Sequence, residues 1–74
     1  MTPNQFYNTY KDADRAKIES VCLAANTTVG NFQQIAVAKG SVGKALAKRL
    51  ADASGGEMSI LEILYPEDYE ESAA

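Results

Sequence analysis

The chain has 74 residues, and 46% of them are hydrophobic, a content that suits one small folded domain and argues against intrinsic disorder. No apolar run approaches the ~20 residues that cross a bilayer, and no signal-peptide pattern opens the chain, which argues against a membrane protein. The net charge of −3 is unlike the basic composition that is typical of DNA-binding proteins.

The side chains that usually carry catalysis are scarce. The chain has no histidine, and Cys22 is its only cysteine, which excludes an internal disulfide and a thiol activated by imidazole. Asp12 and Asp14 lack companions that could complete a metal site, and capping of the next helix is the role expected of one of them. We therefore expect a protein that is not an enzyme and that uses no metal or cofactor.

The first ten residues predict a helix from Pro3 to about Tyr10. Thr2 and Gln5 have the spacing of a capping box, and Pro3 suits the first helical position. Phe6 and Tyr10 lie four residues apart on one face. Core packing of these rings is favoured over the alternative, a platform on which bases stack.

The stretch from Arg15 to Lys39 predicts two helices joined by a short break. Asn26 tolerates the left-handed conformation that ends a helix, and Thr28 suits the N-cap of a second helix, expected at about 28–38. The apolar residues recur at helical spacing on the inner face of each helix. They are Ile18, Val21, Cys22 and Ala25 in the first helix, and Phe32, Ile35 and Ala36 in the second.

Two helices joined by so short a turn are typical of a helix-turn-helix motif, in which the second helix lies in a DNA major groove. Such a helix needs side chains that donate and accept hydrogen bonds at base edges, and small residues where the backbone comes close. The residues expected to make base contacts are Thr28, Gly30, Gln33 and Gln34.

Lys39 and Gly40 are expected to end this helix, and Ser41 to cap the next one. The inner stripe expected for that next helix is Val42, Ala45, Leu46, Leu50 and Ala53. Its outer side carries Lys44 and Lys48, which suit either an ordinary solvated face or contacts with phosphates. The phosphate contacts expected overall are Asn31, Lys39, Lys44 and Lys48.

A short apolar helix is expected near the C-terminus. Gly55 and Gly56 stop the preceding helix, and Ser59 with Glu62 forms a capping box for residues 60–65, which end at Pro66. One face cannot bury all the apolar side chains of this helix, so we expect a homodimer interface there. The expected interface residues are Ile60, Leu61, Leu64 and Tyr65. The domain should span residues 1–66, followed by an acidic flexible tail at 67–74.

Charge is unevenly distributed along the chain. No acidic residue lies between Ser20 and Ala51, whereas four basic residues do; after Leu50 there are seven acidic residues and no basic one. An acidic protein can therefore still present a locally positive face to a phosphate. Ordinary solvated faces remain the alternative explanation of these blocks.

The chain from about Thr2 to Asp68 resembles the Cro/cI-type helix-turn-helix regulators of phages and prophages, most closely the YdaS-like branch. The resemblance rests on the segment Ala25–Phe32, on the following Gln34-Ile35-Ala36, and on the segment Leu50–Ser59. It implies an all-α, compact five-helix domain of the lambda-repressor-like type, generally a repressor and often a dimer. Asn26 stands where that family usually has glycine, and the cluster of Arg and Lys common after the second motif helix is missing.

Two hypotheses follow for the function. The first is a sequence-specific regulator of transcription, a repressor that binds an operator in double-stranded DNA as a homodimer. Its expected location is the bacterial cytoplasm or a phage-infected host. The second is a protein-interaction module, such as an antirepressor that binds another regulator, which the net charge of −3 and the acidic tail favour.

Overall fold

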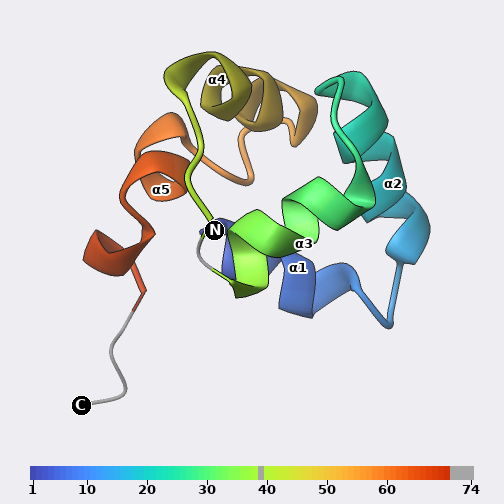
Figure 1. The fold of residues 1–74 in the computed structure, drawn as a ribbon. Helices are drawn as coiled ribbons and strands as arrows, with labels where there is room; N and C mark the ends of the chain where they lie inside the picture. Colours follow the sequence, from blue (N-terminus) through green and yellow to red (C-terminus); the bar gives the residue numbers. More distant parts are fainter. Residues whose placement is uncertain (39, 71–74) are drawn as a thin grey trace.

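In a computed structural model, which describes residues 1–38 and 40–70, the chain is all-helical and compact (Figure 1). The described residues contain five α-helices, one short 3-10 helix and no strand. The helices are α1 (Pro3–Tyr10), α2 (Arg15–Ala24), α3 (Val29–Val37), α4 (Lys44–Ala53), α5 (Ile60–Leu64) and the 3-10 helix η1 (Pro66–Asp68).

Four of the five α-helices begin at a side chain that accepts a hydrogen bond from the first turn. These N-caps are Thr2, Asp14, Thr28 and Ser59. The capping boxes expected for Thr2 with Gln5 and for Ser59 with Glu62 are both present. Capping satisfies backbone N–H groups that have no partner inside a helix, so these local signals set where the chain turns helical.

The start and the inner side of α4 differ from the sequence-based expectation. Gly43, and not Ser41, is the N-cap, and it provides no side-chain bond. Val42 therefore lies before the helix. Of the inner stripe expected for α4, Leu50 is buried, and Val42, Leu46 and Ala53 are partly buried against the core. Ala45 is exposed, and Ala47 and Ala51 are buried instead. Alanines occur on both sides of this helix, so periodicity could not show which of them are buried.

Left-handed residues end two of the helices. Asn26, with φ of 60°, lies just after α2, and the Thr27 N–H reaches back to the Cys22 carbonyl at 2.9 Å. Gly55, with φ of 65°, has the same place after α4, where the Gly56 N–H donates to Ala51. Both reversals match the expectation that these residues tolerate positive φ.

The core lies where the inner sides of all five α-helices meet. Phe32 of α3 is fully buried, and its ring lies edge-on to that of Phe6 in α1, with centroids 6.0 Å apart. The inner residues expected for α2 and α3 are all buried as predicted. In Figure 1, α3 crosses in front of α1, while α4 and α5 cover the opposite side of the core.

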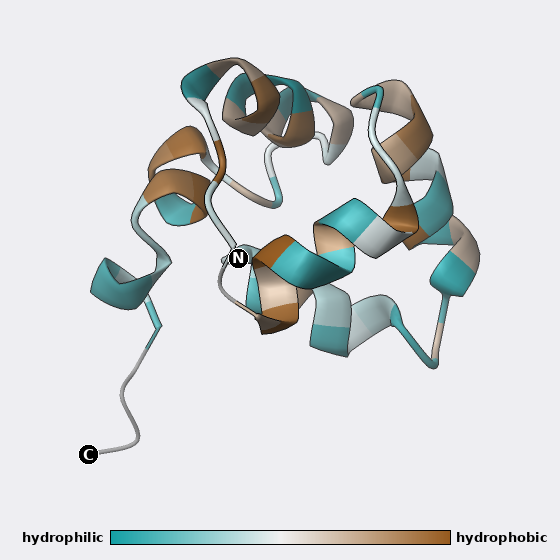
Figure 2. Cartoon of the chain, viewed as in Figure 1, coloured by the Kyte–Doolittle hydropathy of each residue, from teal (hydrophilic) through white to brown (hydrophobic). Residues whose placement is uncertain are grey.

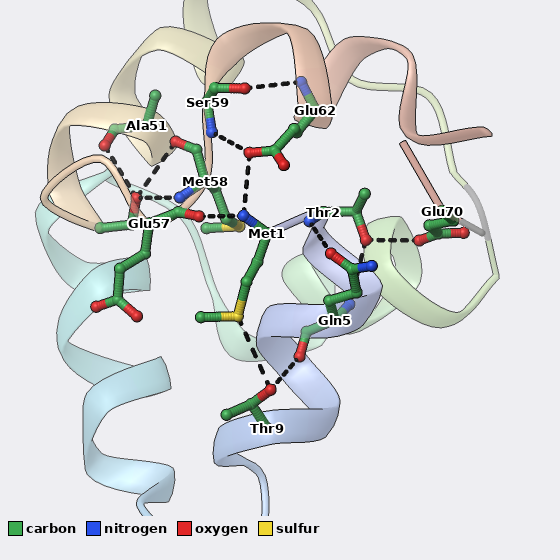
Figure 3. Close-up of polar contacts among 11 residues, drawn as sticks. Met1, Thr2, Gln5, Thr9, Ala51, Glu57, Met58, Ser59, Glu62 and Glu70 are labelled. Atoms are coloured by element: carbon green, nitrogen blue, oxygen red, sulfur yellow. Dashed lines mark hydrogen bonds and ion pairs between the residues drawn. The ribbon is translucent and has the colours of Figure 1, made fainter. Parts of the chain in front are cut away.

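The first two residues of the chain form hydrogen bonds with residues near the C-terminal end of the described chain (Figure 3). The amino group donates to the Glu57 carbonyl and to the Glu62 carboxylate, whose pKa is lowered first by the Ser59 backbone N–H and then by this amino group. The buried Thr2 hydroxyl donates to Glu70 at 2.6 Å. Glu70 thus contacts the domain beyond the boundary expected at residue 66, whereas Glu67, Asp68 and Tyr69 are exposed. Residues 71–74 of the expected tail lie outside the described residues.

A polar cluster anchors the connection between α4 and α5. The Glu57 carboxylate accepts hydrogen bonds from the Lys17 ammonium and from the Tyr10 hydroxyl, and the Lys17 nitrogen lies 4.5 Å from the centre of the Tyr10 ring. The bond to Lys17, and then the bond to Tyr10, lowers the pKa of Glu57; the bond to Glu57 raises the pKa of Lys17. Tyr10 is therefore only partly a core residue.

Candidate nucleic-acid interface

Helices α2 and α3 are joined by four residues, Ala25 to Thr28. Ala25 is fully buried, Asn26 reverses the chain and Thr28 caps α3 by accepting from the Asn31 N–H at 3.0 Å. The Asn31 side-chain amide donates to the Thr27 hydroxyl at 2.9 Å. These contacts fix the start of α3 through its own neighbours, and they leave its outer side free of tertiary packing.

The outer side of α3 is exposed and carries no charge. All four residues expected to contact bases are exposed, and they lie on α3 or at its N-cap: Thr28, Gly30, Gln33 and Gln34. A Cβ added at Gly30 would meet nothing nearer than the Thr28 hydroxyl oxygen, at 4.0 Å. Packing within the fold therefore gives no reason for a glycine at this position.

The cations expected to hold phosphates differ in their surroundings. Lys44 is exposed and has no carboxylate partner among residues 1–38 and 40–70. Lys48 is also exposed, but its ammonium lies 3.3 Å from the Asp52 carboxylate one turn later, so Lys48 has a counter-charge within its own helix. Lys39 lies outside the described residues, and Asn31 is exposed at the flank of α3.

Arg49 has a structural role that was not expected from the amino-acid sequence. Its Nε donates to the Ala25 carbonyl at 2.8 Å, so α4 holds the end of α2 where the turn into α3 begins. The two residues are 24 positions apart, and no spacing rule connects an arginine in one helix with a carbonyl in another. The one sequence feature that could have drawn attention to Arg49 is the stretch without acidic residues in which it lies.

A second exposed surface lies on α5, a helix drawn largely in brown in Figure 2 because most of its residues are hydrophobic. Leu61, Tyr65 and Ile60 are 53%, 49% and 39% exposed. Leu64, expected in the same interface, is instead partly buried against the core. It lines a hollow of about 270 Å³ between α5 and the connection that follows α3, where Ile35 and Val42 form part of the wall. The exposed apolar surface therefore contains three of the four residues expected at the dimer interface.

Other kinds of site find no support in the part of the chain that the structure describes. No group of three or more His, Cys, Asp or Glu side chains there could hold a metal ion, and no helix there is long and apolar enough to cross a membrane. Cys22 is buried, and burial raises the pKa of its thiol. Comparison of the chain with protein families, curated proteins and solved structures finds no match.

Proposed function

We propose that this protein is a sequence-specific DNA-binding regulator of the phage or prophage repressor type, with α2, its four-residue turn and α3 as a helix-turn-helix. One observation carries the proposal: the outer side of α3 is exposed, uncharged and lined by Thr28, Gly30, Gln33 and Gln34. Most exposed helices carry charges on their outer side for solvation. A helix of amides and one small residue suits the base edges of a major groove.

Each of these residues has a distinct role in the proposal. Gln33 and Gln34 present amides that match the donor and acceptor pair on an adenine edge, which favours A·T pairs in the operator. Gly30, which the fold does not need, lets the backbone approach the bases. Thr28 already accepts the Asn31 N–H, and its hydroxyl proton remains for a base or a phosphate.

Local charge supports this proposal despite the negative total. Asp52, Glu57, Glu62 and Glu70 are each engaged within the domain, by Lys48, Lys17, the Met1 amino group and Thr2 respectively. The acidic residues of the C-terminal third are thus partly neutralised, and the segment that contains α3 has none. A phosphate responds to this local potential more than to the net charge.

An anisotropy titration with labelled duplex DNA tests the proposal. The duplex comes from the region upstream of the protein's own gene, and a shuffled duplex of equal composition is the control. We expect the upstream duplex to bind at least about tenfold more tightly, since specific sites commonly exceed non-specific DNA by 10³ or more. Folded protein that binds neither duplex at low salt would overturn the proposal.

The regulator acts as a homodimer through α5 in this proposal. Ile60, Leu61 and Tyr65 place apolar side chains in water beside the hollow that Leu64 lines. A second copy would cover these side chains, and a side chain from it could enter the hollow. A symmetric pair also supplies two recognition helices, about one DNA turn or ~34 Å apart, which compensates for the few cations in one copy.

Sedimentation equilibrium across micromolar concentrations tests the dimer in the absence of DNA. Leu61→Asp should make the protein monomeric without unfolding it, because Leu61 is more than half exposed. Thr9→Asp, on the exposed side of α1, is the control and should leave association unchanged. A wild type that is monomeric at every concentration would remove the dimer but not the DNA-binding proposal.

A second candidate function is favoured by the same α5 surface. An apolar side flanked by the exposed carboxylates of Glu67 and Asp68 would also suit a basic partner protein, such as another regulator. In that case Leu61→Asp should abolish partner binding, whereas Gln34→Ala should have no effect on it. DNA binding that depends on Gln34 and survives Leu61→Asp in weakened form favours the first function instead.

A further inference from the structure

Among the cations of the described chain, Arg49 is the one whose position is fixed by the turn that precedes α3. Its Nε bond to the Ala25 carbonyl occupies one of five guanidinium N–H groups and leaves the four on the two terminal nitrogens. Arg49 is exposed, and it has no ion pair within residues 1–38 and 40–70.

None of the other cations among residues 1–38 and 40–70 is bonded to this turn. Lys48, the neighbour of Arg49, pairs with Asp52, and Arg15 lies 3.7 Å from Glu19. Within the described residues Lys44 has no ion pair, and neither does Lys11, whose nitrogen lies 5.9 Å from the centre of the Tyr7 ring. Arg49 is thus the cation that is bonded directly to the turn into α3.

We infer that Arg49 has two simultaneous roles: its Nε holds the α2–α3 turn through the Ala25 carbonyl, and its terminal nitrogens bind a DNA backbone phosphate beside the start of α3. Arginine suits this division, because its planar fork can bond in two directions and stays charged. The bond to Ala25 also holds the side chain in place before DNA arrives, so little side-chain entropy remains to be lost. The inference rests on the proposed DNA binding and assigns a contact within it.

The first test measures binding to a mixed-sequence duplex over a range of salt concentrations. Arg49→Gln should weaken binding to every sequence alike and reduce the slope of log affinity against log salt by about 0.9, the value for one phosphate. Arg49→Lys should keep the slope, since it keeps the charge. Lys48→Gln is the matched control, and it should change the slope much less, because Asp52 already neutralises Lys48.

The second test uses the wild type, so it does not depend on how a variant folds. Arg15 and Arg49 are the only arginines in the chain, and an arginine-selective dicarbonyl reagent followed by mass spectrometry reports on each. Bound duplex DNA should protect Arg49 at least several-fold more than Arg15. Equal modification with and without DNA, or an unchanged salt slope in Arg49→Gln, assigns Arg49 to the turn alone. A wild type that binds no DNA overturns both the inference and the proposed function.

Discussion

Helices α3 and α5 have the same construction on the inside and opposite surfaces on the outside. Each begins at a hydroxyl cap, Thr28 or Ser59, and each buries an apolar inner side, which includes Phe32 in α3 and Ile63 in α5. Outside, α3 presents amides, a glycine and, at its last position, the apolar Val37. The exposed side chains of α5 and its C-cap are all apolar or aromatic: Ile60, Leu61 and Tyr65. Folding explains the inner sides of both helices. The outer sides do not pack within the fold, and the proposed contacts with DNA and with a second copy would account for their difference.

Removal of the Phe32 side chain should have the largest effect on stability, because it leaves a cavity where α3 packs against the core. Phe32 is fully buried and contacts the rings of Phe6 and Tyr7. Phe32→Ala should lower the free energy of unfolding by about 3–5 kcal/mol. Urea denaturation followed by circular dichroism measures this loss. Leu61→Ala is the control on the outer side of α5, and an equal loss there would contradict the contrast between inner and outer sides.

Gln34→Ala should sharpen the contrast by changing binding without changing stability. The Gln34 side chain is exposed, so the unfolding midpoint in urea should stay the same. Under the proposed function, binding to the cognate duplex should weaken by about 1–3 kcal/mol, more than binding to shuffled DNA, because base contacts carry specificity. Equal weakening on both duplexes would instead assign Gln34 to the phosphate backbone.

Asn26 offers a test of how the turn positions α3. Asn26 has a φ of 60°, and this left-handed conformation is roughly 1 kcal/mol less favourable for alanine than for residues that tolerate it. Asn26→Ala should therefore destabilise the domain by about that amount. Asn26→Gly should be no less stable than the wild type. Thermal unfolding of both variants measures the difference, and an Asn26→Ala variant as stable as wild type would show that the turn relaxes.

The smallest expected effect is the pH dependence of the contact that precedes α5. Because Lys17 and then Tyr10 lower the pKa of Glu57, the folded state binds fewer protons there than the unfolded state. The contribution of Glu57 is therefore complete above its ordinary pKa and is lost as pH falls through the lowered value. The raised pKa of Lys17 works in the opposite direction, so its contribution is lost as pH rises through that value.

Glu57→Gln isolates this effect. The variant should lose stability at neutral pH, and the difference from the wild type should shrink in acid, as measured by urea denaturation at several pH values. Glu19→Gln is the matched control, because the exposed Glu19 carboxylate lies 3.7 Å from Arg15. This variant should change the free energy of unfolding little at any of these pH values. A difference that stays constant from neutral pH into acid would show that the Glu57 charge does not stabilise the domain.

The amino-acid sequence by itself determined the local structure of this protein. The caps at Thr2, Thr28 and Ser59, the reversal at Asn26 and the inner residues of α2 and α3 each depend on side chains a few positions apart. Such signals act through a single helical turn, so they can be read from spacing alone. The exposure of the four residues expected to contact bases follows from the same spacing, because Phe32, Ile35 and Ala36 fix the opposite side of α3.

Tertiary structure alone decided the remaining features. Three features depend on which helices meet: the choice of alanines that α4 buries, the engagement of Glu57 by Lys17 across 40 positions, and the bond from Arg49 to Ala25. The same is true of Leu64, which turns toward the hollow while Leu61 faces solvent. Charge and apolarity are properties of single residues, but burial and pairing depend on neighbours that the folded chain brings close. A long-range contact carries no period in the sequence, which is why Arg49 emerged only from the structure.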